Sequence, residues 1–144
     1  ERAAAEKELA RITAAQLVQA KSWNGGLGSA QLAWFERTCA EARAAGQRVI
    51  VLAHQPVYPE NQHNIWNDAE VLAAIDRQPN VVAWLNGHNH DGNFGERNGI
   101  SYLNLRGMVE SPGPNAFATA QILPDRLLLT GHGREPSREL KFRV

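Results

Sequence analysis

The stretch Leu85-Asn86-Gly87-His88-Asn89-His90-Asp91-Gly92 determines how the rest of the chain is interpreted. It follows the apolar run Val81–Leu85, whose β-branched and aromatic residues predict a buried strand that a glycine ends. His88 and His90 then lie on a tight loop after that strand. Imidazole is a common ligand of transition metals, and a strand end supplies the rigid support that a ligand needs. The alternative is that His88-Asn89-His90 is only a polar turn.

A second segment repeats this pattern. The apolar run Arg48–Ala53 predicts another buried strand, His54 follows at its carboxyl end, and Pro56 stops the strand. Ligands of open α/β sheets bind at the carboxyl ends of the strands. Two strands that each deliver a histidine to that edge therefore predict a metal site rather than two unrelated turns.

Composition predicts one globular domain, residues 1–144, with 43% hydrophobic residues and enough chain for a core. Acidic and basic residues balance at 15 each, so charge gives no reason to expect nucleic acid or a membrane surface as a partner. No apolar run approaches the roughly 20 residues of a membrane span. The single cysteine, Cys39, excludes an intrachain disulfide and fits a reducing, cytoplasmic location.

The first residues, 1–21, are rich in strong helix formers and predict a peripheral helix. The chain begins at Glu1, already inside this helical pattern and without an initiator methionine. We therefore expect a larger open reading frame, whose amino-terminal part is absent here. For the same reason the sequence does not exclude a signal peptide.

The middle of the chain predicts two further helices and a long connection. Apolar residues recur at helical spacing over 29–45, and Cys39 lies on that stripe as a buried structural thiol. Residues 55–67 form a connection long enough to be functional, in which His63 is a possible supplementary ligand or acid/base group. A helix over 68–77 then joins the two histidine-bearing strands, which predicts a βαβ unit with parallel strands.

The pattern changes after the histidine loop. Runs at 100–105, 117–122 and 127–130 alternate and predict antiparallel strands, with a hairpin turn at 123–126. The Gly/Pro-rich loop 107–115 is expected to border the site. The polar tail 131–144 is expected to lie over the surface.

These residues resemble the carboxyl-terminal half of the calcineurin-like metallophosphoesterases, and most of all the manganese-dependent ADP-ribose/CDP-alcohol diphosphatases. The resemblance extends from Trp23 to near the end of the chain. The matching segments are Trp23–Gly28, Trp66-Asn67, Gly87–Gly92, Gly107–Glu110, Asn115–Phe117, Gly133-Arg134 and Pro136–Arg138. The resemblance implies an α/β fold of the αββα sandwich type, with a βαβ unit followed by antiparallel strands.

By that resemblance, His54 and His88 would bind one divalent metal ion and His90 a second, and all three would be catalytic. Water activated by the metals would attack phosphorus and cleave a phosphoester or phosphoanhydride bond. Manganese fits the mixed oxygen and imidazole ligands, with zinc, iron, nickel or cobalt as alternatives. The loops with Asn115 and Phe117 would line a cleft for a phosphodiester or nucleoside-diphosphate substrate.

The sequence departs from the family in one large respect. The aspartate, asparagine and histidine motifs that complete the dinuclear site lie upstream in full-length members, and this chain has none of them. Asp91 and Glu110 are nearby carboxylates that could compensate, although each could equally be a solvated loop charge.

Three hypotheses therefore stay open. The chain is part of a hydrolase, active with its amino-terminal half or as a homo-oligomer. Alternatively, His54, His88 and His90 form a three-histidine mononuclear site with an open position for water. The third is a truncated, non-catalytic half-domain that binds metal or dimerises through an exposed sheet edge.

Overall fold

The computed structural model describes residues 2–110 and 113–143, whose contacts divide the chain into two compact units. The first unit contains residues up to 49 together with 57–81, and the second contains 50–56 and 82–144. The assignment of one domain therefore stays a prediction. No helix in the described part of the chain is long and apolar enough to cross a membrane.

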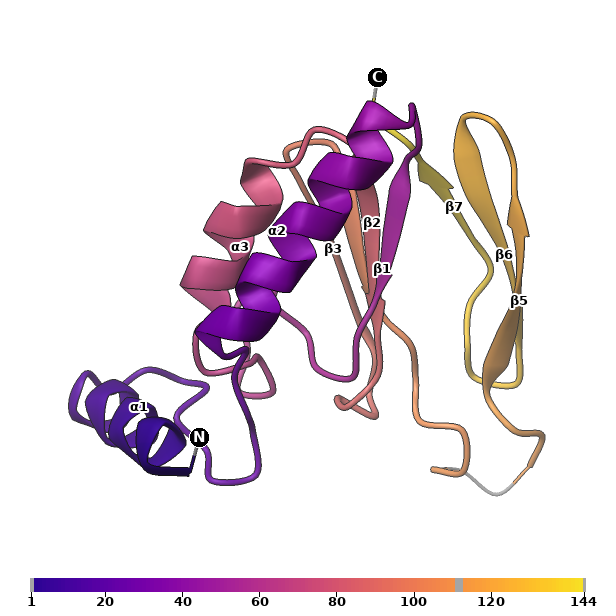
Figure 1. Ribbon diagram of the computed structural model, residues 1–144. Coiled ribbons are helices and arrows are strands. Elements are labelled where there is room, and N and C mark those ends of the chain that lie inside the picture. Colours follow the sequence, from indigo (N-terminus) through magenta and orange to yellow (C-terminus); the bar gives the residue numbers. More distant parts are fainter. Residues whose placement is uncertain (1, 111–112, 144) are drawn as a thin grey trace. The chain divides into compact units, whose positions relative to one another are not determined.

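The first unit carries three helices: α1 (Arg2–Ala14), α2 (Ser29–Ala44) and α3 (Asp68–Asp76) (Figure 1). Helix α1 buries a single side chain, Ile12, which fits the predicted peripheral helix. It ends seven residues before the predicted limit at 21 because Gln16 adopts a φ of 54°, and the chain turns there. The Gly-rich segment after it, residues 22–28, forms no helix or strand.

Helices α2 and α3 pack against one another. The buried side chains of α2 are Leu32, Phe35 and Cys39, which follow the predicted helical spacing. Burial raises the pKa of the Cys39 thiol, with Glu36 adding to the effect, so the thiol stays protonated and apolar. The predicted structural role of Cys39 is therefore confirmed.

The second unit contains a four-stranded sheet in the order β1-β2-β4-β3. Its strands are β1 (Val49–Leu52), β2 (Val81–Asn86), β3 (Asn93–Arg97) and β4 (Ile100–Asn104). Val49 N donates to Asn80 O at 2.8 Å and Ala53 N to Leu85 O at 3.0 Å. These bonds join the two strands start to start and end to end, so β1 and β2 run in the same direction, as the βαβ prediction required.

Two expectations for this sheet are wrong, the alternation of β4 and the burial of β1, and the antiparallel pairing expected for β4 holds on one side only. Strand β4 is parallel to β2 and antiparallel only to β3, a strand that the sequence did not predict. β4 does not alternate, because its central position buries all five residues. β1 is an edge strand and only half-buried, with Leu52 78% exposed.

A three-stranded antiparallel sheet completes the second unit, with β5 (Phe117–Ile122), β6 (Arg126–His132) and β7 (Arg138–Lys141) in that order. Leu123 N donates to Arg126 O at 2.9 Å, which confirms the predicted hairpin turn. The expectation that the tail lies over the surface is wrong: β7 pairs with β6, and Leu140 is 1% exposed.

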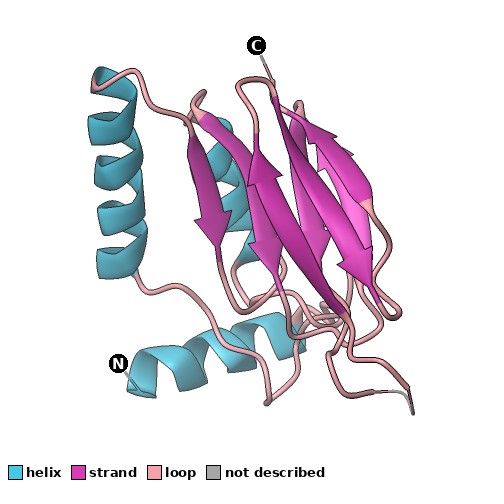
Figure 2. Cartoon of the chain, turned by 90° about the vertical axis from the view of Figure 1, so that its right-hand side faces the viewer, coloured by secondary structure: helices cyan, strands magenta, loops and turns pink. Residues whose placement is uncertain are grey.

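The two sheets of this unit pack against one another through a shared apolar core, and Figure 1 shows them from the side and Figure 2 from the face. Leu103 of β4 meets three leucines of the smaller sheet, and the apolar side chains of Ile50, Leu85 and Leu105 pack against this cluster. The smaller sheet contributes Leu127, Leu129 and Leu140. This core fixes the strand ends from which the histidine loops project.

Candidate metal centre

His54 and His88 are brought to the same edge of the four-stranded sheet. Gly87 N donates to His54 O at 3.1 Å, so the two chain segments remain hydrogen-bonded past the ends of β1 and β2. The Trp84 indole also donates to Gln55 O at 3.3 Å and fastens the turn after His54. The predicted convergence of the two histidine-bearing strands is therefore seen.

The facing nitrogens of this pair have the spacing of two ligands of one ion. His88 Nδ1 lies 3.2 Å from His54 Nε2, and the ring centroids are 5.0 Å apart. Two imidazole nitrogens, each about 2.0–2.1 Å from one ion at an angle of roughly 90–110°, lie about 2.8–3.4 Å apart. The pair therefore fits part of a metal site.

The backbone of His88 is unusual. Its φ is +72°, in the left-handed region that side chains with a Cβ rarely adopt. Such a conformation costs of order 1–3 kcal/mol and is found where the surrounding structure requires it, often at functional sites. Here the turn directs the His88 ring toward His54, whereas the next histidine of the motif takes a different partner.

His90 pairs with Glu110. Its Nδ1 lies 2.6 Å from Glu110 Oε1, with 63% and 41% of the two side chains exposed. Among the described residues, no three side chains of histidine, cysteine, aspartate or glutamate form a group that could hold one metal ion. The chain thus presents a His54–His88 pair and a separate His90–Glu110 pair, and the three histidines do not form the single mononuclear site.

The sequence did not identify the residue that holds this loop in place, Asn104. Its Nδ2 donates to Asn89 O at 2.6 Å and to Leu105 O at 2.8 Å. Its Oδ1 accepts from Asn86 Nδ2 at 2.7 Å and, more weakly, from Asn89 N at 3.4 Å. The side chains of Asn86 and Asn104 are buried. Through its bonds to the backbone of Asn89, Asn104 holds the residue between His88 and His90 in place. The signal for Asn104 in the sequence was that β2 and β4, which are mostly apolar, each end in an asparagine, Asn86 and Asn104.

The other residues proposed from sequence make different contacts from these pairs. Asp91 is exposed, and its carboxylate forms no hydrogen bond or ion pair with the described residues. The Phe117 ring stacks on His132 at 4.4 Å between centroids. Asn115 lies in the β4–β5 loop, where its backbone is close to Gly133. His63 belongs to the first unit, and its ring centroid is 5.0 Å from that of Trp23.

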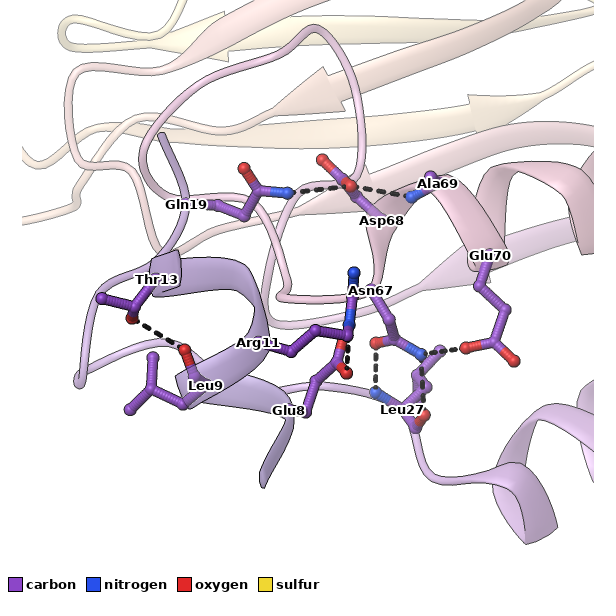
Figure 3. A network of polar contacts seen from close by, with 10 residues as sticks. All are labelled: Glu8, Leu9, Arg11, Thr13, Gln19, Leu27, Asn67, Asp68, Ala69 and Glu70. Atoms are coloured by element: carbon purple, nitrogen blue, oxygen red, sulfur yellow. Dashed lines mark hydrogen bonds and ion pairs between the residues drawn. The ribbon is translucent and has the colours of Figure 1, made fainter. Parts of the chain in front are cut away.

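The first unit holds a polar network around the start of α3 (Figure 3). Asn67 bridges the Gly-rich segment: its Oδ1 accepts from Leu27 N at 3.0 Å, and its Nδ2 donates to Leu27 O at 2.9 Å and to Glu70 at 2.7 Å. A Cβ on Gly26 would lie 2.9 Å from Asn67 Oδ1, which explains the glycine there. The matching segments Trp23–Gly28 and Trp66-Asn67 are thus joined in space.

Asp68 is the second centre of that network. It accepts hydrogen bonds from Gln19 at 3.0 Å, from Asn64 at 3.0 Å and from Ala69 N at 2.7 Å. Burial nevertheless raises the pKa of its carboxyl, because loss of solvation outweighs these donors. An open cavity of about 1230 Å³ borders Asp68, and its walls carry both arginines and glutamates, which gives it no clear preference for anions. We assign this network a structural role.

The comparisons with known proteins agree with the fold and place the chain in a family. The sequence model of the calcineurin-like phosphoesterases matches residues 7–92, a segment that ends with the loop carrying His88 and His90. This match covers more than half of the chain. The chain therefore belongs to the calcineurin-like phosphoesterase family.

The relatives of known name in this comparison are manganese-dependent diphosphatases. The manganese-dependent ADP-ribose/CDP-alcohol diphosphatase of Mus musculus is 34% identical over 126 residues, which cover 84% of this chain and 37% of that protein. The protein of the same name from Arabidopsis thaliana is 32% identical over 124 residues, covering 83% and 40%. The chain thus spans about two fifths of the length of these relatives.

Two solved structures share the fold. A dimetal phosphatase from Danio rerio superimposes with a TM-score of 0.81 and 27% identity, covering 87% of this chain and 41% of that one. GAP50 of Plasmodium, described as the anchor in the inner membrane complex, has a TM-score of 0.57 at 13% identity, and this shows likeness of fold only. The α/β prediction is confirmed.

Proposed function

We propose that this chain carries part of the active site of a metal-dependent hydrolase that cleaves phosphoester or phosphoanhydride bonds. The observation that carries the proposal is the His54–His88 pair, whose nitrogens lie 3.2 Å apart at the carboxyl ends of neighbouring parallel strands. Family membership adds support, because the relatives in the comparison are named as diphosphatases and one solved neighbour as a dimetal phosphatase.

In this proposal His54 and His88 hold one divalent ion and His90 holds the other. Two bound divalent ions activate water and stabilise charge on the attacking and leaving oxygens. The histidines contribute neutral nitrogen ligands, and the loop held by Asn104 keeps His88 and His90 in their positions. Manganese is the proposed ion because the matched relatives are named manganese-dependent.

The three histidines supply no negative charge to balance two divalent ions, and Glu110 is engaged with His90. We therefore propose that carboxylate ligands come from another segment of the protein or from a second copy of this chain. The proposed substrates are small molecules with a phosphodiester or diphosphate group, such as ADP-ribose or CDP-alcohols, because those compounds appear in the names of the relatives. We also propose a cytoplasmic location, which the single cysteine fits.

The test is metal content per chain by elemental analysis, together with manganese-dependent hydrolysis of bis-p-nitrophenyl phosphate, ADP-ribose and CDP-choline. His54→Ala and His88→Ala should each lose both bound metal and turnover. His132→Ala is the matched control, because His132 lies on β6 and stacks on Phe117. Absence of both bound metal and turnover in the native chain would contradict the enzymatic proposal for this chain alone.

A second candidate function rests on the edge of the larger sheet. β1 is the outer strand, and Leu52 on it is 78% exposed. Exposed strand edges pair readily with another chain. A non-catalytic, dimerising half-domain therefore predicts association that increases with concentration in analytical ultracentrifugation, is reduced in Leu52→Lys and is unaccompanied by turnover.

A further inference from the structure

The contact between His90 and Glu110 determines which ring nitrogen of His90 carries hydrogen. His90 Nδ1 and Glu110 Oε1 are 2.6 Å apart, which is within hydrogen-bond distance and slightly shorter than the roughly 2.7–2.9 Å of charge-assisted N–H···O bonds. An ionised carboxylate only accepts, so the hydrogen belongs to Nδ1. In a neutral imidazole with hydrogen on Nδ1, Nε2 keeps its lone pair.

The backbone around Gly107 brings the carboxylate to His90. Gly107 N donates to His90 O at 2.9 Å, which ties the loop carrying Glu110 to the histidine loop. A Cβ on Gly107 would lie 2.6 Å from Glu110 Cγ and 2.9 Å from His90 Cβ. Only glycine therefore leaves room for the pair at this position.

Residues of the turn between β6 and β7 form hydrogen bonds to the start of the loop that carries Glu110. Arg106 N donates to Glu135 Oε2 at 2.7 Å, and Arg134 Nη2 donates to Gly107 O at 3.2 Å. Glu135 is 5% exposed, so this attachment is buried. The backbone at Arg106 and Gly107, where the loop that carries Glu110 begins, is thus held by several bonds in addition to the contact of Glu110 with His90.

We propose that Glu110 is a positioning residue that holds His90 in the tautomer with hydrogen on Nδ1, so that Nε2 is the nitrogen that binds metal. This deepens the proposed function and rests on it for the metal, whereas the tautomer is a property of the metal-free chain. Metal-binding histidines commonly donate their other N–H to a carboxylate in this way, and loss of that partner typically costs 10–100-fold in metal affinity.

The tautomer is measured in the metal-free chain with ¹⁵N-labelled histidine and long-range ¹H–¹⁵N correlation spectra at about pH 8.5, some two units above the ordinary histidine pKa of about 6.5. A His90→Gln spectrum identifies the His90 signals. Native His90 should show hydrogen on Nδ1. In Glu110→Ala the population should move to the form with hydrogen on Nε2, while the backbone amide spectrum of the rest of the chain stays unchanged.

Asp91→Ala is the matched control, because it removes a neighbouring exposed carboxylate that has no contact with the ring. It should leave the His90 tautomer unchanged. The proposal is overturned if native His90 carries hydrogen on Nε2, if Glu110→Ala leaves the tautomer as it was, or if Asp91→Ala changes it as much.

A manganese titration separates this inference from the proposed function. Paramagnetic broadening of the histidine signals should require at least tenfold more manganese for His90 in Glu110→Ala than in the native chain, and the same amount in Asp91→Ala. If manganese broadens none of His54, His88 and His90 in the native chain, the proposed metal site fails. The tautomer spectra still decide the role of Glu110 in that case.

Discussion

Replacing Asn104 by alanine should loosen the histidine loop by an amount that follows from its hydrogen bonds. The substitution removes three short bonds, to Asn89 O, Leu105 O and Asn86 Nδ2, at 2.6, 2.8 and 2.7 Å. Each intramolecular hydrogen bond contributes about 0.5–1.5 kcal/mol net, so the free energy of unfolding should fall by about 2–4 kcal/mol. With a slope of about 2 kcal/mol/M, the urea midpoint should fall by about 1–2 M.

The matched control is Asn93→Ala. Asn93 lies directly opposite Asn104 in the β3–β4 register, but its side chain makes one local bond, to Phe94 N at 2.9 Å. It should cost less than about 1 kcal/mol. The account of Asn104 is refuted if Asn104→Ala lowers the free energy of unfolding no more than Asn93→Ala does. It is also refuted if the NMR signals of the His88 and His90 rings are unchanged in Asn104→Ala.

Asn104→Asp separates hydrogen bonding from packing, because the side-chain volume is kept. The carboxylate still accepts from Asn86, but it places negative charge against the carbonyl oxygens of Asn89 and Leu105. At neutral pH this variant should therefore be at least as unstable as Asn104→Ala. Part of the loss should return in acid, when the protonated carboxyl donates again, and a urea series against pH measures this.

Three other changes test separate parts of the structure. Because the left-handed backbone of His88 costs a residue with a Cβ about 1–2 kcal/mol, His88→Gly should be more stable to urea than His88→Ala by about 1 kcal/mol, and equal midpoints would contradict strain there. The pKa of Asp68 is raised in the native state, so the native state binds this proton more tightly than the unfolded state does. The free energy of unfolding should therefore fall as the pH rises from 3.8, the ordinary pKa of the carboxyl, through its raised native pKa. The unfolding free energy of Asp68→Asn, measured against pH, should lack that decrease, and a curve parallel to the native one would contradict it. Gly107→Ala should cost about 1–3 kcal/mol in urea unfolding through overlap with His90 and Glu110, and an unchanged midpoint would show that the loop moves aside.

The sequence by itself determined the local elements and the positions of the histidines. Apolar runs marked β1 and β2, helical spacing marked α2 and α3, and the hairpin turn marked the start of β6. A histidine after each of two parallel strands then followed from the general geometry of α/β sheets. These inferences held because they depend on periodicity and turn chemistry within a few residues.

Tertiary structure decided the strand partners. β3 escaped prediction because Asn93, Gly95 and two charged residues suppress the apolar pattern, and the strand is formed by its pairing with β4. The sequence predicts a surface tail at β7, because Leu140 is the one residue of this strand that is buried. β4 is antiparallel to β3, as predicted, but it is also parallel to β2, because strand direction depends on which neighbours the sheet supplies and no local pattern encodes them.

For the candidate site too, sequence predicted some features and tertiary structure decided others. Sequence predicted His54, His88 and His90 as ligands, which stays a prediction, and named Glu110 only as one of two possible carboxylates. Which carboxylate meets a histidine depends on how loop 107–110 folds back, and that depends on Gly107 and on bonds to the distant β6–β7 turn. Asn104 shows the same limit, because a buried asparagine acquires a function only when a loop from another strand brings backbone groups within its reach.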